Sequence, residues 1–177
     1  SILAIENLSA TLAGKQVVDD VSLTVGKGSF MGLIGPNGAG KSTFLRACLG
    51  LVPASGTVRL DGIDLASLRA TERARHLAYL PQEREIAWAM SVEDVVALGR
   101  LPHHARFATS SQRDRAAIEA ALARMDLTAF RHRAVTRLSG GERARVLIAR
   151  ALAQETPVLL ADEPLAGLDP QHQIALM

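Results

Sequence analysis

The sequence predicts a mixed α/β fold that carries an inserted helical segment. Short apolar runs typical of strands lie on both sides of a first helix, whereas the middle of the chain has the periodicity of helices. The predicted strands are residues 2–8, 21–25, 29–34, 57–60, 77–80 and 157–161. The predicted helices are residues 41–50, 91–98, 111–124 and 140–154, and a last helix is expected to begin at Asp169-Pro170.

The strand predictions depend on apolar patterning and on the turns between the runs. Residues 21–25 alternate between apolar and polar side chains, which is the period of a half-buried strand. The turn Gly26-Lys27-Gly28 leads into Ser29–Ile34, whose apolar run suits the buried strand that should precede a phosphate loop. Asp61-Gly62 and Pro81 end the next two strands.

The helix predictions depend on start signals and on apolar stripes. Ser91-Val-Glu-Asp94 is a capping-box pattern, and residues 111–124 carry apolar side chains at helical spacing. Residues 84–150 are therefore predicted to form a helical subdomain, and residues 1–83 with 151–177 a core that includes a β-region.

Length and composition limit the class of protein. The chain has 177 residues, of which 48% are hydrophobic and 21% charged, and this fits one domain with an inserted subdomain. The net charge is only +2, and the arginine-rich stretch 124–150 lacks interleaved aromatic residues, so a nucleic-acid partner is not expected. Cys48 is the single cysteine, no run of 18 apolar residues occurs, and the start at Ser1 lacks a signal-peptide pattern. We therefore expect a soluble, cytoplasmic protein.

A complete phosphate-binding loop follows the predicted strand 29–34. It consists of Gly35, Pro36, Asn37, Gly38, Ala39, Gly40, Lys41, Ser42 and Thr43. The glycines let successive backbone N–H groups point at phosphates, and the helix that begins at Lys41 adds its positive dipole end. Lys41 can reach the β- and γ-phosphates, and Ser42 can offer its hydroxyl to Mg²⁺. The sequence therefore predicts binding of a nucleotide with Mg²⁺.

Polar side chains follow two predicted strands at the points where the strands end. Asp162 and Glu163 end strand 157–161, and in α/β sheets ligands lie beyond the carboxyl ends of strands. Asp162 can hold Mg²⁺ through its water shell, and Glu163 can polarise an attacking water. Gln82 can ligate Mg²⁺ or contact the γ-phosphate. Taken alone, each of these would be an ordinary strand-end or loop residue, and the phosphate loop favours the functional interpretation.

Leu138-Ser139-Gly140-Gly141-Glu142 precedes the helix 140–154. Ser139 and Glu142 make a capping box, which is a sufficient structural reason for both residues. A capping box does not need two glycines in the first turn, where they weaken a helix. Bare N–H groups at a helix start bind anions, and this favours a phosphate-binding role for the segment.

Together these residues resemble the motifs of the ATP-binding-cassette family. Gly35–Thr43 is similar to its Walker A loop, Gln82 to its Q-loop, and Leu138–Glu142 to its signature motif, with Glu where Gln is commoner. Val158–Glu163 resembles Walker B with the catalytic glutamate, and Ala166-Gly167-Leu168-Asp169 resembles the D-loop. The order and spacing match over essentially the whole chain.

The resemblance implies a fold, cofactors and roles. The fold would be a P-loop NTPase core with an antiparallel β-region and an inserted helical subdomain, and the family works as head-to-tail dimers that enclose two ATP molecules. The implied catalytic residues are Lys41, Gln82 and Glu163, and the implied Mg²⁺ partners are Ser42, Gln82 and Asp162. The residues implied to bind the ATP of the opposite subunit are Ser139, Gly140, Gly141 and Glu142, with Asp169 at the dimer contact.

A finer likeness concerns the type of transporter. Residues 78–82 and 91–103 resemble those of importers of metal chelates such as iron-siderophores, haem and cobalamin. This implies an ATPase subunit that is peripheral on the inner face of the cell membrane and drives a transmembrane permease. His103 and His104 could suggest a metal site, but adjacent side chains point to different faces and no third ligand is evident.

Two departures from the family pattern leave alternatives open. Leu12 lies near the position of an aromatic residue that stacks on adenine in the family, so it offers only apolar contact to an ATP base. The chain ends 14 residues after Glu163, before the family's switch histidine and last core strands, and His172 is too close to replace that histidine. A truncated cassette that binds ATP without hydrolysing it is one alternative. A non-transport cassette that acts on nucleic acid or the ribosome is another, although the chain has one cassette and no heptad run.

Overall fold

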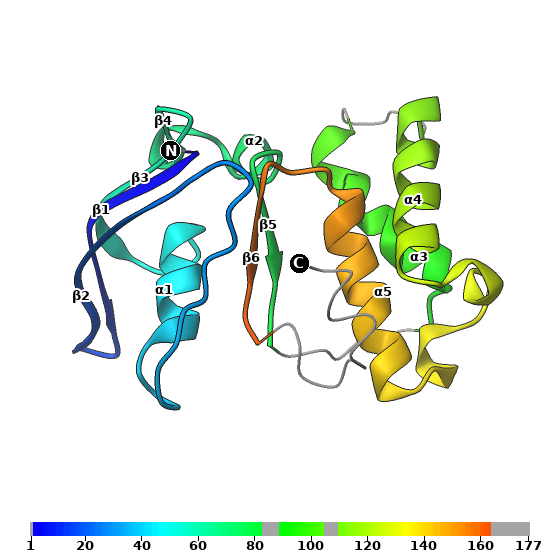
Figure 1. Cartoon of the computed structure of the whole chain (residues 1–177), viewed down its shortest axis with the longest axis horizontal. Coiled ribbons are helices and arrows are strands. Elements are labelled where there is room, and N and C mark those ends of the chain that lie inside the picture. The colour runs from blue at the N-terminus through cyan, green and yellow to red at the C-terminus, as the bar shows by residue number, and fades with distance from the viewer. Residues whose placement is uncertain (1, 83–88, 105–109, 164–177) are drawn as a thin grey trace. The chain divides into compact units, whose positions relative to one another are not determined.

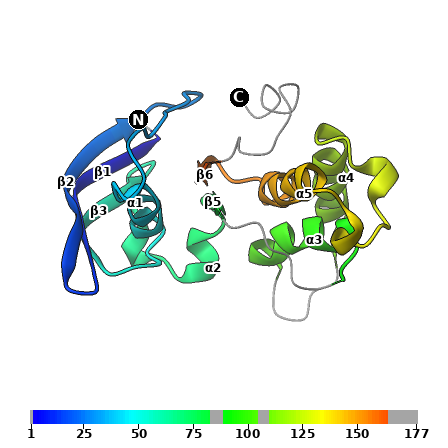
Figure 2. The ribbon, with the colours of Figure 1, turned by 90° about the horizontal axis from the view of Figure 1, so that it is seen from below.

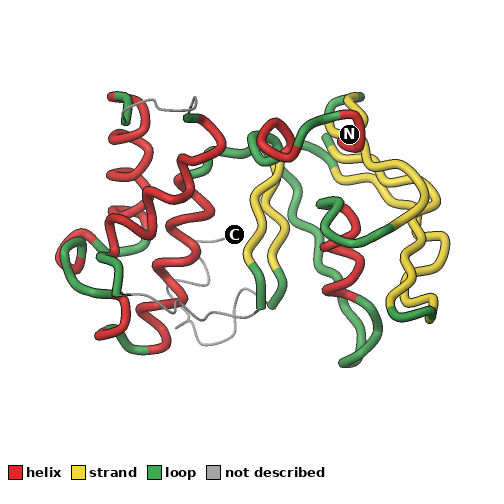
Figure 3. The backbone as a smooth tube through the Cα atoms, turned by 180° about the vertical axis from the view of Figure 1, so that it is seen from behind, coloured by secondary structure: helices red, strands yellow, loops and turns green. Residues whose placement is uncertain are grey.

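The computed structural model describes residues 2–82, 89–104 and 110–163. Two compact units are present, residues 1–77 and residues 78–177 (Figure 1). A four-stranded sheet belongs to the first unit, and most of the helical residues belong to the second (Figure 3). The prediction of a mixed α/β fold is therefore confirmed.

The sheet of the first unit is antiparallel and has the strand order β2-β1-β3-β4. Its strands are β1 (Leu3–Leu12), β2 (Lys15–Val25), β3 (Ala54–Leu60) and β4 (Ile63–Asp64). The first two strands extend further than predicted because they form one long hairpin. Its turn, Ala13-Gly14, has φ of 49° and 78°, and two positive φ angles match the twist of the strands they join.

The core of the first unit lies between this sheet and helix α1 (Lys41–Cys48), which packs against β1 and β2 (Figure 2). The buried positions of β1 alternate on either side of a register shift between Ile5 and Leu8, as expected where one face of a sheet is covered. The buried apolar residues of these two elements are Leu3, Ile5, Leu8, Ala10, Phe44, Leu45, Ala47 and Cys48. Two short elements, η1 (Leu65–Ser67) and α2 (Ala70–Arg73), complete the unit.

The predicted buried strand at residues 29–34 is wrong for this structure. The segment forms no strand, and its large apolar side chains are exposed, Phe30 to 71% and Ile34 to 96%. A buried strand needs a hydrogen-bonding neighbour and a covered face. Among the described residues, the sheet of the first unit consists of the four strands β1, β2, β3 and β4, and none of them pairs with this segment.

The second unit contains a two-stranded sheet and a helical bundle. Strands β5 (Leu77–Leu80) and β6 (Val158–Ala161) pair with each other, and the former has the predicted bounds. The α-helices are α3 (Val92–Ala97), α4 (Gln112–Arg124) and α5 (Gly140–Ala153), and the 3₁₀ helices are η2 (Leu98–His103), η3 (Thr128–Phe130) and η4 (Val135–Arg137). The three predicted helices are therefore confirmed, with ends within about one residue of the prediction.

The three α-helices of this unit surround one apolar core. Serine side chains begin each of them: Ser91 accepts from the N–H of Asp94, and Ser111 and Ser139 form full capping boxes with Asp114 and Glu142. The residues with no more than 2% exposure in this core include Val92, Val95, Val96, Leu122, Met125, Leu127, Val135, Val146 and Ile148.

Gly99 in η2 is packed against the end of α5 and gives a stability prediction. A Cβ atom there would lie 2.2 Å from the backbone oxygen of Arg150 and 3.3 Å from the Cβ of Ala153. We expect Gly99→Ala to lower the free energy of unfolding by about 2 kcal/mol or more, because a backbone oxygen cannot turn aside as a flexible side chain can. Urea unfolding measures this. Gly140→Ala is the matched control in the same unit, where a Cβ meets no atom within 4 Å and the added methyl should favour the helix. Equal stability of the two variants would contradict the prediction.

Candidate nucleotide site

The phosphate loop lies in the first unit and leads directly into α1. Gly38 and Gly40 have φ of 80° and 88°, and Gly40 is the residue that precedes the helix. A Cβ on Gly40 would lie 2.7 Å from the backbone oxygen of Val17 in β2, so this position needs glycine for both its angle and its packing. The loop from Gly35 to Ala39 is exposed, which leaves its backbone accessible to a ligand from solution.

The ammonium group of Lys41 is held within the loop. Its Nζ atom donates to the backbone oxygens of Gly35 at 2.7 Å and Pro36 at 2.9 Å. The loop therefore curls around a positive charge, and the N–H groups at the start of α1 add a partial positive charge beside it. Ser42 and Thr43 are half-buried on the first turn of the helix. An anion is the ligand that this arrangement favours.

Leu12 ends β1, on the same unit as the loop, and its side chain is 37% exposed. This exposed side chain is accessible from solution. Its role in binding adenine stays a prediction.

Gln82 and Glu163 lie together in the second unit although 81 residues separate them. The amide Nε2 of Gln82 donates to Oε2 of Glu163 at 2.9 Å. The contact follows from the pairing of β5 with β6, since each residue follows shortly after the end of one of these strands. Glu163 is exposed and has φ of 50°, a left-handed conformation that is uncommon for a side chain of this kind. The structure thus brings together two of the predicted site residues, whose roles stay predictions.

Asp162 occupies a more enclosed position than its neighbour. It is 4% exposed, and its backbone N–H donates to the oxygen of Leu80 at 2.9 Å. Its carboxylate oxygen Oδ2 is buried and makes no hydrogen bond to the part of the chain that the structure describes. A buried carboxylate oxygen without a donor is costly unless a cation or its water shell faces it. The Asp162 carboxylate and the Gln82 amide, both in the second unit, carry oxygen ligands of the kind that Mg²⁺ prefers, so these donors fit this ion.

The segment Ser139–Glu142 begins α5 in the way that both sequence interpretations require. The Ser139 hydroxyl accepts from the Glu142 N–H at 3.2 Å, and Oε2 of Glu142 accepts from the Ser139 N–H at 2.7 Å. Hydrogen bonds to the Glu142 carboxylate, first from the backbone N–H of Ser139 and then from its hydroxyl, lower the pKa of that carboxyl. The cap provides hydrogen-bond partners for the N–H groups of Ser139 and Glu142. Gly140 between them is exposed, with open space where a Cβ atom would stand. The two glycines thus leave a bare, accessible backbone surface at the positive end of a 14-residue helix.

Some predicted site residues lie outside the described residues. These are the D-loop residues Ala166 to Asp169 and His172. Asp169 therefore keeps its role at a dimer contact only as an expectation.

His103 and His104 contact different partners in the structure. Nε2 of His103 lies 2.7 Å from the backbone oxygen of Gln154, and Nε2 of His104 lies 3.3 Å from Oδ2 of Asp114. Within the described ranges, no group of three potential ligands comes together around a metal position. The same ranges contain no helix that is both long and apolar enough to cross a membrane.

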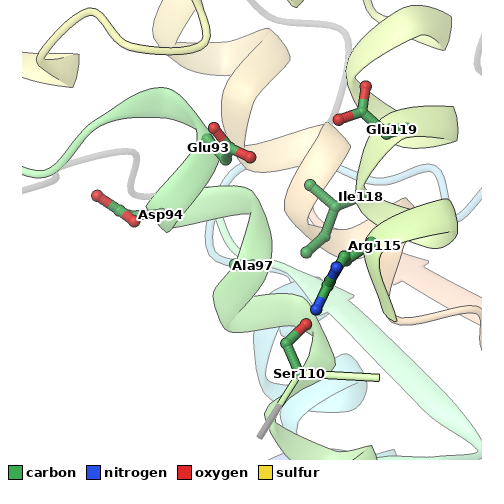
Figure 4. Close-up of a pocket in the computed structure, with 7 residues that line it drawn as sticks. All are labelled: Glu93, Asp94, Ala97, Ser110, Arg115, Ile118 and Glu119. Atoms are coloured by element: carbon green, nitrogen blue, oxygen red, sulfur yellow. The ribbon is translucent and has the colours of Figure 1, made fainter. Parts of the chain in front are cut away.

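One pocket of about 340 Å³ lies between α3 and α4, and none of the predicted nucleotide residues lines it (Figure 4). Its lining combines acidic groups with one arginine: Glu93, Asp94, Ala97, Ser110, Arg115, Ile118 and Glu119. Arg131 pairs with both Glu93 and Glu119, so two of the three carboxylates already share one cation. The pocket therefore adds nothing to the nucleotide site.

The sequence patterns did not predict the buried charge of Arg100. Its guanidinium is 1% exposed and pairs with Asp114, which is also buried. The capping position of Asp114 was within reach of a sequence argument, but its pairing with an arginine 14 residues earlier depends on how η2 packs.

Comparisons with known proteins agree with the motifs. The ABC transporter family model matches residues 18–166. The chain is 47% identical over 173 residues to the "Cobalamin import ATP-binding protein BtuD" of Halobacterium salinarum, a match that covers 97% of this chain and 43% of the relative. It is 48% identical over 178 residues to the "Hemin import ATP-binding protein HmuV" of Pseudomonas entomophila, covering 97% of this chain and 68% of the relative. The chain thus spans less than half of the first relative.

Solved structures show the same fold. A putative metal-chelate type ABC transporter in an inward-facing conformation matches with a TM-score of 0.79 and 32% identity, over 99% of this chain and 64% of that one. The ATP-binding cassette MJ0796, in a dimeric post-hydrolysis state bound to ADP and Pi, matches with a TM-score of 0.82 and 27% identity, over 98% and 79%. The phosphate loop, the paired Gln82 and Glu163, and the family match over most of the chain lead to one conclusion: this chain belongs to the ABC transporter family.

Proposed function

We propose that this chain is the nucleotide-binding part of an ATPase subunit that powers a membrane importer of a metal chelate. The observation that carries the proposal is the hydrogen bond between Gln82 and Glu163 beside the buried carboxylate of Asp162. This hydrogen bond joins Glu163, whose carboxylate can activate water, to Gln82, whose amide can hold that carboxylate in place. The phosphate loop supplies the cationic part of the same chemistry.

The roles of the residues follow from their charges and positions. Lys41 stabilises the negative charge on the β- and γ-phosphate oxygens of ATP as that charge redistributes during transfer to water. Glu163 orients the attacking water and accepts its proton, and the amide of Gln82 fixes the direction of that carboxylate. Ser42, Gln82 and Asp162 would hold Mg²⁺. When bound, Mg²⁺ neutralises phosphate charge and acts as a Lewis acid.

The proposal extends to partners and place. Head-to-tail dimers would put Ser139, Gly140, Gly141 and Glu142 of one subunit against the ATP of the other, and the exposed Gly140 backbone supports this. The cobalamin and hemin import proteins among the relatives support a transmembrane permease as partner and a peripheral position on the inner face of the membrane. The second candidate is a cassette that binds ATP without hydrolysing it.

Steady-state phosphate release by the purified chain tests the proposal. We expect release that saturates with ATP and that stops when EDTA removes Mg²⁺, because the phosphate charge then loses its counterion. Restoration by added Mg²⁺ is the control for damage by the chelator. Binding of a fluorescent ATP analogue without phosphate release would instead assign the chain to the binding-only candidate. If the chain showed neither ATP binding nor phosphate release, both candidates would be refuted.

Co-purification separates the transport function from the nucleic-acid alternative. The chain expressed together with the permease subunits of a metal-chelate importer is expected to remain with detergent-solubilised membrane protein after nuclease treatment. Retention on immobilised DNA or ribosomes, with no recovery in the membrane fraction, would overturn the transport assignment and leave the ATPase chemistry intact.

A further inference from the structure

Arg100 is a charged residue in the interior of the second unit. Its side chain is 2% exposed, although arginine is rarely buried without partners. Its Nε atom donates to Oδ1 of Asp114 at 2.8 Å, and Nη1 donates to the backbone oxygen of Ala153 at 2.7 Å and to Oε2 of Glu155 at 2.9 Å. One planar guanidinium therefore joins the start of α4 to the end of α5.

Residues of η2 besides Arg100 also contact the C-terminal end of α5. Gly99 makes the close approach to the backbone oxygen of Arg150, and His103 hydrogen-bonds the backbone oxygen of Gln154 at 2.7 Å. The last carbonyls of a helix lack partners within it and carry its negative dipole end. A buried arginine on the oxygen of Ala153 is thus placed where a positive charge stabilises the helix most.

Asp114 fixes the other side of the guanidinium. Its Oδ2 atom accepts from the backbone N–H and the hydroxyl of Ser111 at 2.8 and 2.6 Å. These bonds, together with the one from Arg100, hold the pKa of the Asp114 carboxyl well below its usual range. Asp114 is therefore ionised at neutral pH, and its hydrogen bonds to Ser111 hold the carboxylate in place beside Arg100.

The two ends of α5 face different tasks. Its first turn contains Ser139, Gly140 and Gly141, and its last residue is Ala153, about 20 Å away along a helix of 14 residues. After Glu155 the chain enters β6 at Val158, and that strand ends at Ala161, directly before Asp162 and Glu163. A shift of the C-terminal end of α5 would therefore reach Ser139, Gly140 and Gly141 through the helix. It would also reach Asp162 and Glu163 through β6.

We propose that Arg100 is a positioning residue of the ATPase: by closing the end of α5 it sets where the Ser139-Gly140-Gly141 backbone and the β6 carboxylates stand. This inference rests on the proposed function. Arg100 contacts neither nucleotide nor reacting atoms, and its effect passes through α5. The alternative is that Arg100 and Asp114 serve only to stabilise the fold.

A charge-neutral double variant separates these roles. Arg100→Met alone leaves the buried Asp114 carboxylate without its cation, which is strongly destabilising. Arg100→Met with Asp114→Asn removes both charges and keeps an oxygen that can accept from Ser111. Arg113→Met is the matched control, because Arg113 is 77% exposed on its side chain and contacts the same Glu155 at 3.4 Å.

ATP turnover and thermal unfolding are measured for the full chain and each variant. The double variant is expected to lose at least tenfold in kcat, with KM for ATP and Tm close to those of the control, since the phosphate loop belongs to the other unit. A kcat within twofold of the control, or a rise in KM alone, would overturn the proposal. If the double variant does not fold, Arg100→Lys is tested in its place. It should also lower kcat without raising KM, by a smaller factor, because one ammonium group cannot make all the hydrogen bonds of the guanidinium.

Hydrogen exchange distinguishes failure of this inference from failure of the proposed function. If the unmodified chain shows no turnover, the ATPase assignment fails and exchange decides the role of Arg100. Backbone amides of residues 153–156 should then lose at least tenfold in protection in the double variant but not in Arg113→Met. Unchanged protection would show that α5 is held without Arg100 and would overturn the inference.

Discussion

Glu163→Gln is expected to reduce phosphate release by at least a hundredfold while ATP remains bound. Glutamine keeps the size of the side chain and an oxygen that can still accept from Nε2 of Gln82, so the geometry at the strand ends is preserved. What disappears is the negative charge that orients water and accepts its proton. Stopped turnover with retained binding should also allow the ATP-held dimer to accumulate.

Phosphate release and light scattering with Mg-ATP measure these two effects on the same samples. Glu119→Gln is the matched control, since Glu119 lies on α4 in an exposed ion pair with Arg131 that contributes little to stability. Retention of more than a tenth of the unmodified rate by Glu163→Gln would show that another group activates the water. Loss of ATP binding in the same variant would show that the carboxylate has a binding role instead.

Lys41→Met should weaken ATP binding by at least a hundredfold. The ammonium group lies between the backbone oxygens of Gly35 and Pro36 and is the one full positive charge in the described part of this loop. Methionine keeps most of the apolar stem of lysine, one atom shorter, and removes the ammonium charge with its N–H donors. The loop would then retain N–H groups and the helix dipole, which together are weaker than a full charge close to a phosphate.

Titration with a fluorescent ATP analogue gives the dissociation constants, and circular dichroism checks that the fold persists. Lys27→Met is the control, because Lys27 is an exposed lysine of the same unit in the turn before the loop. A change smaller than fivefold for Lys41→Met would contradict the assignment of this loop as the phosphate site.

Local sequence signals predicted the parts of the site that depend on neighbours in the chain. The loop Gly35–Thr43 with its helix, and the caps at Ser91 and Ser139, depend on spacings of a few residues. The placement of Gln82 and Glu163 has a different basis, since each follows an apolar run predicted as a strand and ligand-binding groups lie beyond the carboxyl ends of strands.

The failures of prediction arose where a contact partner is distant in sequence. Residues 29–34 have the composition of a buried strand, but composition does not supply the neighbouring strand that would cover Phe30 and Ile34. The ion pair of Arg100 with Asp114 requires η2 to fold back over α5, which no periodicity encodes. The length of the β1–β2 hairpin depended on Ala13 adopting a positive φ, and alanine gives no signal for that.

Cys48 gives the chain a practical property. Its thiol is buried in α1, and burial raises its pKa to about 12. At pH 8 only about one such thiol in ten thousand would be ionised, and the thiolate is the form that reacts with maleimides and iodoacetamide. A cysteine introduced at an exposed position would react far faster than Cys48. Fluorophores or spin labels can therefore be attached to one chosen site, with the native cysteine kept in place, to follow the encounter of two subunits.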